Sequence, residues 1–128
     1  MKNPDLNVRR GYWCECWTTS PTTGSAPGLF ASFEAVTATQ AVRWIRGVLQ
    51  TIVSALEPDA ADRAWAWMTS GYVAAIGDLE RAQPCAFAIT HASTRIEWTA
   101  RPVLFLTLAH RQGGNLPDCT EQFCGHAR

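Results

Sequence analysis

The segment over residues 37–56 carries the strongest helical pattern in the sequence and most constrains how the chain can fold. Its apolar side chains recur at intervals of three and four residues, which gathers them on one broad face of an α-helix. These residues are Ala41, Trp44, Ile45, Val48, Leu49, Ile52, Val53 and Leu56. An isolated helix of this length is marginal in water, so a face this wide has to pack against a sheet or other helices. We therefore expect this helix to lie in the core.

The residues around this helix predict where it begins and ends. Thr37 followed by Gln40 is the pattern of a capping box, and Pro58 marks a position that the helix cannot pass. Beyond it, Asp59 is the predicted N-cap of a second helix over residues 59–81. The middle of the chain is thus expected to hold two consecutive helices.

Two short strands are predicted before the helices. Residues 11–18 alternate as a strand does. One face would hold Tyr12, Cys14 and Cys16, and the other Trp13, Glu15 and Trp17. Residues 29–35 form the second strand. The connection over residues 19–28 is rich in Pro, Gly, Ser and Thr and is too short for a crossover helix, so we expect the two strands to pair antiparallel.

The sequence of the C-terminal half predicts a β-hairpin. The element after it could be a helix or a strand, because its residue pattern does not decide between them. Residues 85–90 and 95–100 are rich in β-forming residues and flank a short turn. In residues 102–110, Pro102 at a first helical position favours a helix, whereas Val, Phe and Thr favour a strand. The expected fold is α+β in the order β-β-α-α-β-β, with one antiparallel sheet packed on two helices and the final element undecided.

Length and charge set further bounds. A chain of 128 residues is expected to form a single domain over residues 1–128, with loose termini over residues 1–8 and 115–128. No apolar run approaches the roughly 18 residues of a membrane span, and the N-terminus carries no export signal, so we expect a cytoplasmic protein. Eleven basic and eleven acidic residues cancel, which argues against a strong non-specific phosphate-binding surface.

The five cysteines and three histidines are the first candidates for chemistry. A tetrahedral zinc site could be assembled from four members of one set. That set is Cys14, Cys16, Cys119, Cys124 and His126. Its two halves lie far apart in the sequence, and their spacing differs from that of common structural zinc sites. Free thiols packed as small hydrophobic residues are the favoured interpretation, so no cofactor is expected and zinc is the alternative.

Tryptophan and arginine supply the candidate binding surface. Six tryptophans are many for this length, and Trp44, Trp65 and Trp98 occupy positions expected to pack in the core. The other tryptophans, placed beside arginines, would form a surface that combines aromatic stacking with positive charge. The candidate surface residues are Arg9, Arg10, Trp13, Trp17, Trp67 and Arg95.

Catalytic motifs are missing from the sequence. It holds no nucleophile elbow, phosphate-binding glycine loop, dinucleotide fingerprint or H-E-x-x-H motif. His91, at the predicted hairpin turn, could act as a general base only if a cleft formed around it. We therefore expect a non-enzymatic inhibitor or accessory protein, of the immunity, anti-defence or mobile-element type, that binds another protein through a shaped surface. The alternative is a small nucleic-acid-associated module that uses arginine and tryptophan with zinc in support. A homo-oligomer is compatible with both, and no membrane partner is expected.

Overall fold

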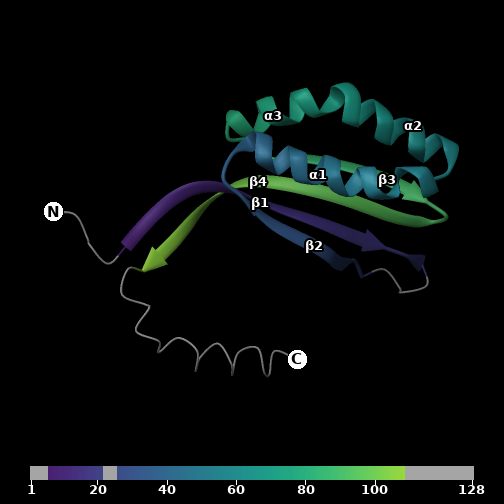
Figure 1. Ribbon diagram of the computed structural model, residues 1–128. Coiled ribbons are helices and arrows are strands. Elements are labelled where there is room, and N and C mark those ends of the chain that lie inside the picture. The colour runs from purple at the N-terminus through teal and green to yellow at the C-terminus, as the bar shows by residue number, and fades with distance from the viewer. Residues whose placement is uncertain (1–5, 22–25, 109–128) are drawn as a thin grey trace. The chain divides into compact units, whose positions relative to one another are not determined.

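The computed structural model describes residues 6–21 and 26–108, and it shows an α+β protein in the predicted order β-β-α-α-β-β (Figure 1). The strands are β1 (Leu6–Thr19), β2 (Gly28–Ala35), β3 (Cys85–His91) and β4 (Thr94–Leu108). They form one four-stranded sheet in the order β2-β1-β4-β3, so β2 and β3 are its edges. The β1–β2 and β3–β4 pairs are antiparallel, which confirms both predicted hairpins.

The described residues divide into two compact units. Residues 10–103 form one unit, which contains every described helix and the paired parts of β2 and β3. The other unit contains residues 6–9 at the start of β1 and residues 104–108 at the end of β4. Within it, the guanidinium carbon of Arg9 lies 4.9 Å from the centroid of the Phe105 ring. That cation–π contact connects the two short strand ends.

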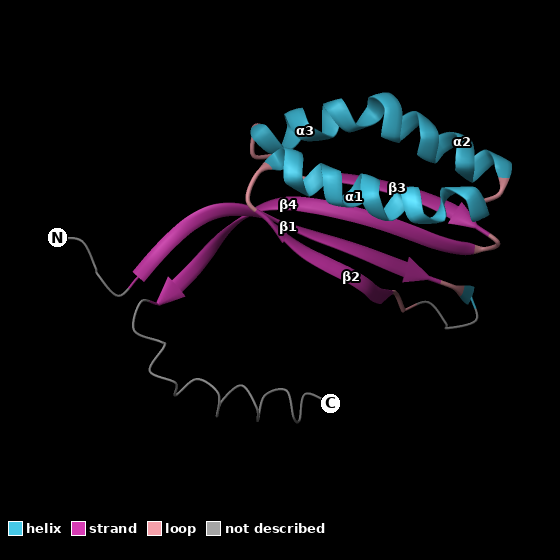
Figure 2. Ribbon diagram, viewed as in Figure 1, coloured by secondary structure: helices cyan, strands magenta, loops and turns pink. Residues whose placement is uncertain are grey.

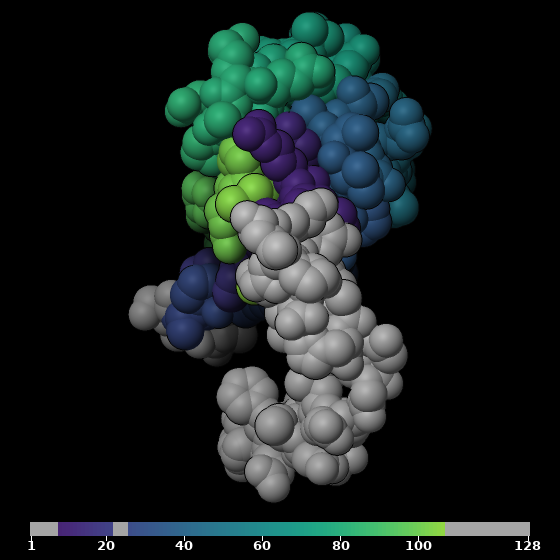
Figure 3. Space-filling view, turned by 90° about the vertical axis from the view of Figure 1, so that its left-hand side faces the viewer, coloured from purple at the N-terminus to yellow at the C-terminus, as the bar shows by residue number. Residues whose placement is uncertain are grey.

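The helices cover one face of the sheet (Figure 2). They are α1 (Ala38–Ile52), α2 (Pro58–Ala66) and α3 (Tyr72–Glu80). A 3₁₀ turn, Val53–Ala55, follows α1, and a π-helical turn, Trp67–Gly71, joins α2 to α3 in one continuous path. In the space-filling view, atoms of the first helix (blue) and of the later helices (teal to green) close over the strands as one layer (Figure 3).

The predicted capping box at the start of α1 is present in a shifted form, because the Gln40 side chain bonds the residue before the N-cap Thr37. The Thr37 hydroxyl accepts a hydrogen bond from the Gln40 N–H at 3.0 Å, and the Gln40 side chain accepts one from the Val36 N–H at 2.6 Å. The prediction that Asp59 caps the second helix was wrong, because Glu57 is the N-cap and Pro58 is the first helical residue of α2. Proline is favoured there because its fixed φ suits a helix and its missing N–H would have no partner in the first turn.

The core lies between α1 and the helix-facing side of the sheet. Ile45 and Leu49 of α1 are fully buried, as are Cys14 of β1 and Trp98 of β4. Around them, the rings of Phe33 and Trp44 stack at 5.8 Å, Trp67 and Phe87 at 5.3 Å, and Phe87 and Trp98 at 6.1 Å. The predicted apolar face of residues 37–56 is therefore confirmed at its centre, since Ala41, Ile45 and Leu49 are fully buried. Val42, which was not assigned to that face, is buried as well.

Trp65 does not join this core. Its side chain is 49% exposed, so the prediction that it packs inside was wrong. The buried stripe of α2 and the turn after it consists of Ala60, Ala64 and Met68, which are spaced by four residues. Trp65 follows Ala64 directly and therefore lies about 100° around the helix from that stripe.

Strands β1 and β4 extend further than the sequence pattern indicated. β1 begins at Leu6, so residues 6–8 of the predicted loose terminus belong to a strand, and β4 continues through Pro102 to Leu108. Pro102 had favoured a helix, but the last β3–β4 pair is Cys85 with Ala100, so β3 has already ended there. A proline is tolerated in a strand where no neighbour needs its N–H. Residues 109–110 and 115–128 lie outside the described residues.

Replacing Leu49 with alanine tests the assigned core. Leu49 has 0% exposure, so Leu49→Ala should lower the free energy of unfolding by about 2–5 kcal/mol in a denaturant titration. The neighbouring residue provides the control, because Gln50 is exposed and Gln50→Ala should change it by less than about 0.5 kcal/mol. Equal effects of the two substitutions would contradict the buried face assigned to α1.

Candidate binding surface on the open face of the sheet

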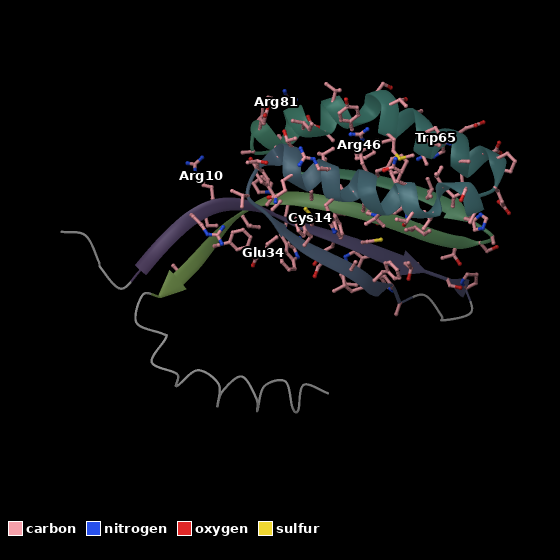
Figure 4. The ribbon with its side chains drawn as sticks, viewed as in Figure 1. Arg10, Cys14, Glu34, Arg46, Trp65 and Arg81 are labelled. Carbon is pink, nitrogen blue, oxygen red and sulfur yellow. The ribbon has the colours of Figure 1, made fainter. Side chains whose placement is uncertain are left out.

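The face of the sheet that points away from α1, α2 and α3 carries the candidate surface, and no helix among the described residues covers it (Figure 2). Alternation along β1 places Cys14 and Cys16 under the helices and the residues between them on this open face. The register with β2 pairs Trp13 with Glu34, Glu15 with Ser32 and Trp17 with Leu29. Figure 4 shows Glu34 on the side of the sheet away from the helices, and Trp65 on the helical side.

Glu15 lies between Trp13 and Trp17 and fixes both indoles. The Trp13 Nε1–H donates to Glu15 Oε2 at 2.8 Å, and the Trp17 Nε1–H donates to Glu15 Oε1 at 3.0 Å. Arg101 of β4 adds a longer ion pair, with its Nη1 at 3.7 Å from Glu15 Oε1. One carboxylate therefore holds two large aromatic side chains in defined positions on an otherwise open sheet.

These hydrogen bonds also explain the ionisation of Glu15. The hydrogen bond from Trp17 and then that from Trp13 lower the pKa of the Glu15 carboxyl below its usual 4.5, and Arg101 contributes in the same direction. Partial burial opposes them but does not reverse the shift. The carboxylate is therefore the form that this arrangement stabilises.

The charges on the open face are mixed and slightly acidic. The register that pairs Glu97 with Ala88 and Arg95 with Thr90 places these two β4 side chains on the same face as Glu15, with the Arg95 Nη2 at 3.8 Å from Glu97 Oε1. Together with Glu34 and Arg101, the paired strands bring three carboxylates and two guanidinium groups to this face. A dominant positive field, which a phosphate backbone would need, is therefore missing here.

An apolar end adjoins the two tryptophans. The ladder between β1 and β2 shifts after Cys16, and beyond this irregularity Trp17 pairs with Leu29. Leu29 is 51% exposed and the neighbouring Phe30 is 70% exposed. Aromatic side chains beside aliphatic ones, with charged residues around them, are the composition of interface hot spots.

The six residues predicted to form a surface do not lie together. Trp13, Trp17 and Arg95 share the open face. Trp67 lies on the helical side, where its ring stacks on Phe87. Arg10 is exposed near the start of the larger unit, and Arg9 belongs to the other unit.

The cysteines of the proposed zinc set are divided between the core and the undescribed tail. Cys14 and Cys16 are buried among apolar side chains, whereas Cys119, Cys124 and His126 lie outside the described residues. Within residues 6–21 and 26–108, no three metal-binding side chains come close enough to hold an ion. Zinc therefore stays the untested alternative to free thiols.

Burial changes the chemistry of the three described thiols. Desolvation is the main cause that raises the pKa of Cys14 from 9.0 to about 12, and those of Cys16 and Cys85 to about 11. These thiols stay protonated near neutral pH and behave as small hydrophobic residues.

His91 has a structural contact. Its Nδ1 accepts a hydrogen bond from the Glu57 N–H at 3.1 Å, which joins the end of β3 to the N-cap of α2. This bond satisfies one of the backbone N–H groups that a helix start leaves without an internal partner. The contact gives His91 a positioning role between the hairpin and the helix.

Sequence reasoning missed Glu15 as a site residue, although the signal was present. The segment Trp-Cys-Glu-Cys-Trp puts a carboxylate midway between two tryptophans that are four residues apart, all on one strand face. Side chains two residues apart on such a face are neighbours, so the indole N–H groups had an acceptor within reach. Arg101 could not be placed against Glu15 before the β1–β4 neighbourhood was known.

Acid titration of stability tests the Glu15 contacts. Because the folded-state pKa of Glu15 is lowered, its stabilising contribution is present above the unfolded value of 4.5 and is lost as the pH falls through the folded value. In Glu15→Gln, the free energy of unfolding should therefore fall less steeply below pH 4.5 than in the wild type. Thermal unfolding at several acidic pH values measures this, and parallel curves would contradict it.

The dependence of stability on alkaline pH tests the raised pKa values of the buried thiols. Their raised pKa values mean that the folded chain keeps protons that the unfolded chain releases above pH 9.0, so stability should fall from pH 9.0 to about 12. The double variant Cys14→Ala, Cys16→Ala should show a shallower decline over this range in denaturant titrations. The same slope in both proteins would show that these thiols do not set the alkaline dependence.

Comparisons with known proteins do not assign a family to this chain. In the part of the chain that the structure describes, we find no helix that combines the length and the apolar character needed to span a bilayer. The chain matches no protein-family model, no curated protein and no solved structure.

Proposed function

We propose that this chain is a non-enzymatic binding protein, of the inhibitor or accessory type, that recognises another protein through the open face of its sheet. The observation that carries this proposal is the Trp13–Glu15–Trp17 arrangement, in which one carboxylate accepts hydrogen bonds from both indoles. Large side chains held in this way lose little conformational freedom on binding. Association through them is correspondingly favoured.

The composition of the open face supports a protein partner. Tryptophan and arginine are the residues most enriched among interface hot spots, and Trp13, Trp17 and Arg101 provide both. The exposed Leu29 and Phe30 extend this surface with apolar area. A partner with a flat, mainly apolar centre and mixed charges at its rim would match it.

The charges favour a protein over a nucleic acid. A single-stranded nucleic acid would also stack on the half-buried Trp13 and Trp17. However, Glu15, Glu34 and Glu97 lie on the same face and would repel phosphates, and Arg95 and Arg101 each lie within 4.0 Å of a carboxylate. The nucleic-acid module is therefore the second candidate, and the two tryptophans are the observation in its favour.

Site-specific photo-cross-linking in the organism that encodes the chain tests the proposal. A benzoylphenylalanine in place of Ser32, which pairs with Glu15 on the open face, should give one cross-linked protein. The same amino acid in place of Trp65, which is exposed on the helical side, is the matched control and should not. Substitution Trp17→Ser should weaken the Ser32 cross-link by about tenfold, as expected when an interface hot spot is truncated.

The possible outcomes separate the candidates. A protein cross-link at position 32 that Trp17→Ser removes supports the proposal, provided that thermal unfolding shows a folded variant. A cross-link to nucleic acid at position 32 would instead support the second candidate. Cross-linking at position 65 alone would overturn the assignment of the open face.

A further inference from the structure

The outer edge of β3 lies on the opposite border of the sheet from β2, and within residues 6–21 and 26–108 no strand pairs with it. Ala92 and Ser93 form the turn to β4, and their φ angles of 51° and 71° are those of a two-residue type I′ hairpin. Such a hairpin makes His91 and Thr94 a hydrogen-bonded pair. By alternation, the N–H and C=O groups at positions 86, 88 and 90 point away from β4, toward this outer edge.

The usual protections of an edge strand are missing from β3. Its sequence, Cys85–His91, contains no proline and no lysine, and its register with β4 runs without a bulge. Natural edge strands commonly carry such features because unpaired backbone groups invite another strand. What covers this edge is the side chain of Arg63 from α2, whose Nη2 donates to the Ala88 carbonyl at 2.6 Å.

The hydrogen bond to the neutral Ala88 carbonyl leaves the positive charge of Arg63 without a negatively charged partner. Among the described residues, no carboxylate lies within 4.0 Å of its guanidinium. Its other close contact is the Phe87 ring, with the guanidinium carbon 5.5 Å from the centroid. A carboxylate would be a stronger acceptor than the neutral Ala88 carbonyl, because hydrogen bonds between charged groups are shorter and stronger.

Two hollows of about 310 Å³ each lie between α2 and β3, and Arg63 lines both of them. One is apolar and aromatic, with Trp67 and Phe87 in its walls. The other lies against Ala88 and Thr90 and includes Asp59 and Arg95. Side chains two positions apart on a strand point the same way and lie about 6.8 Å apart, so neighbouring side chains of one added strand could enter both.

The π-helical turn shapes the aromatic hollow. Gly71 closes this turn, and a Cβ atom there would lie 2.9 Å from Cδ1 of the Trp67 indole. Any side chain at position 71 would therefore force the indole to move. π-Helical turns are rare and occur frequently at functional sites.

We propose that the edge of β3 is a second binding site, which accepts an extended peptide segment from a partner protein as an added strand. The segment carries an acidic side chain that binds the guanidinium of Arg63, and an apolar side chain two positions away that enters the hollow beside the stacked rings of Trp67 and Phe87. Charge complementarity with Arg63 selects the acidic residue. The proposal does not rest on the Trp13–Glu15–Trp17 arrangement, although Arg95 of the open face also lines the second hollow.

The exchange conserves hydrogen bonds. When a carboxylate binds Arg63, the Ala88 carbonyl loses its charged donor and becomes free to accept an N–H from the added strand. The outward N–H groups at positions 88 and 90 gain carbonyl partners in the same step. Arg63 thus covers the β3 edge in the free protein, and its positive charge favours binding of acidic segments there.

A random decapeptide library displayed on phage is the probe that tests this site. Selection on the wild-type protein should enrich peptides with Asp or Glu two positions from an apolar residue. Selection on Arg63→Glu should enrich Lys or Arg at the acidic position instead. Arg43→Glu is the matched control, because Arg43 is an exposed residue of α1, and it should enrich the same peptides as the wild type.

Two measurements on an enriched peptide complete the test. Arg63→Gln should weaken its binding by about tenfold or more, as expected for loss of a charged hydrogen bond. Hydrogen exchange should show new protection of the amides at positions 86, 88 and 90. A consensus that Arg63→Glu leaves unchanged, protection of other strands, or self-association of the chain in place of peptide binding would each overturn the proposal.

Discussion

The packing of α1 on the sheet is the interaction on which the rest of the structure depends. Ile45 and Leu49 belong to one buried cluster with Cys14, Cys16 and Trp98, and α2 and α3 extend the same layer toward β3. Because this layer covers one face only, every second residue of the strands is left on the other face. The helical packing therefore determines which side chains of β1 become surface, and it turns Trp13, Glu15 and Trp17 outward together.

Both proposed sites arise where the fold leaves strand groups without a covering layer. On the open face, the uncovered groups are side chains, and Glu15 organises them by accepting from two indoles. At the β3 edge, the uncovered groups are backbone amides and carbonyls, and Arg63 covers them with one hydrogen bond to Ala88. In each case a single charged residue holds the surface in place. At the β3 edge, the charge of Arg63 also defines which partner chemistry fits.

The sequence allowed much of the fold to be predicted, and the failures have local causes. The three-and-four spacing of residues 37–56 and the alternation of residues 11–18 are periodic signals, and both were read correctly. Pro102 suggested a helix because proline is common at a first helical position. Its tolerance in β4 depends on β3 having ended beside it, and local sequence does not show which strands pair. Trp65 was misplaced because the sequence alone does not distinguish an exposed apolar residue from a member of the buried stripe beside it. Arg63 was missed for a further reason: its contact with Ala88 joins residues 25 positions apart.

The central claim is that one carboxylate fixes both indoles on the open face, and NMR of the indole N–H groups tests it most directly. In spectra of ¹⁵N-labelled protein recorded during an acid titration, two of the six tryptophan signals should move together, with a common midpoint below pH 4.5. Both shifts should be absent in Glu15→Gln. Indole signals of Trp13 and Trp17 that do not titrate, or that titrate with different midpoints, would contradict the arrangement on which the binding surface rests.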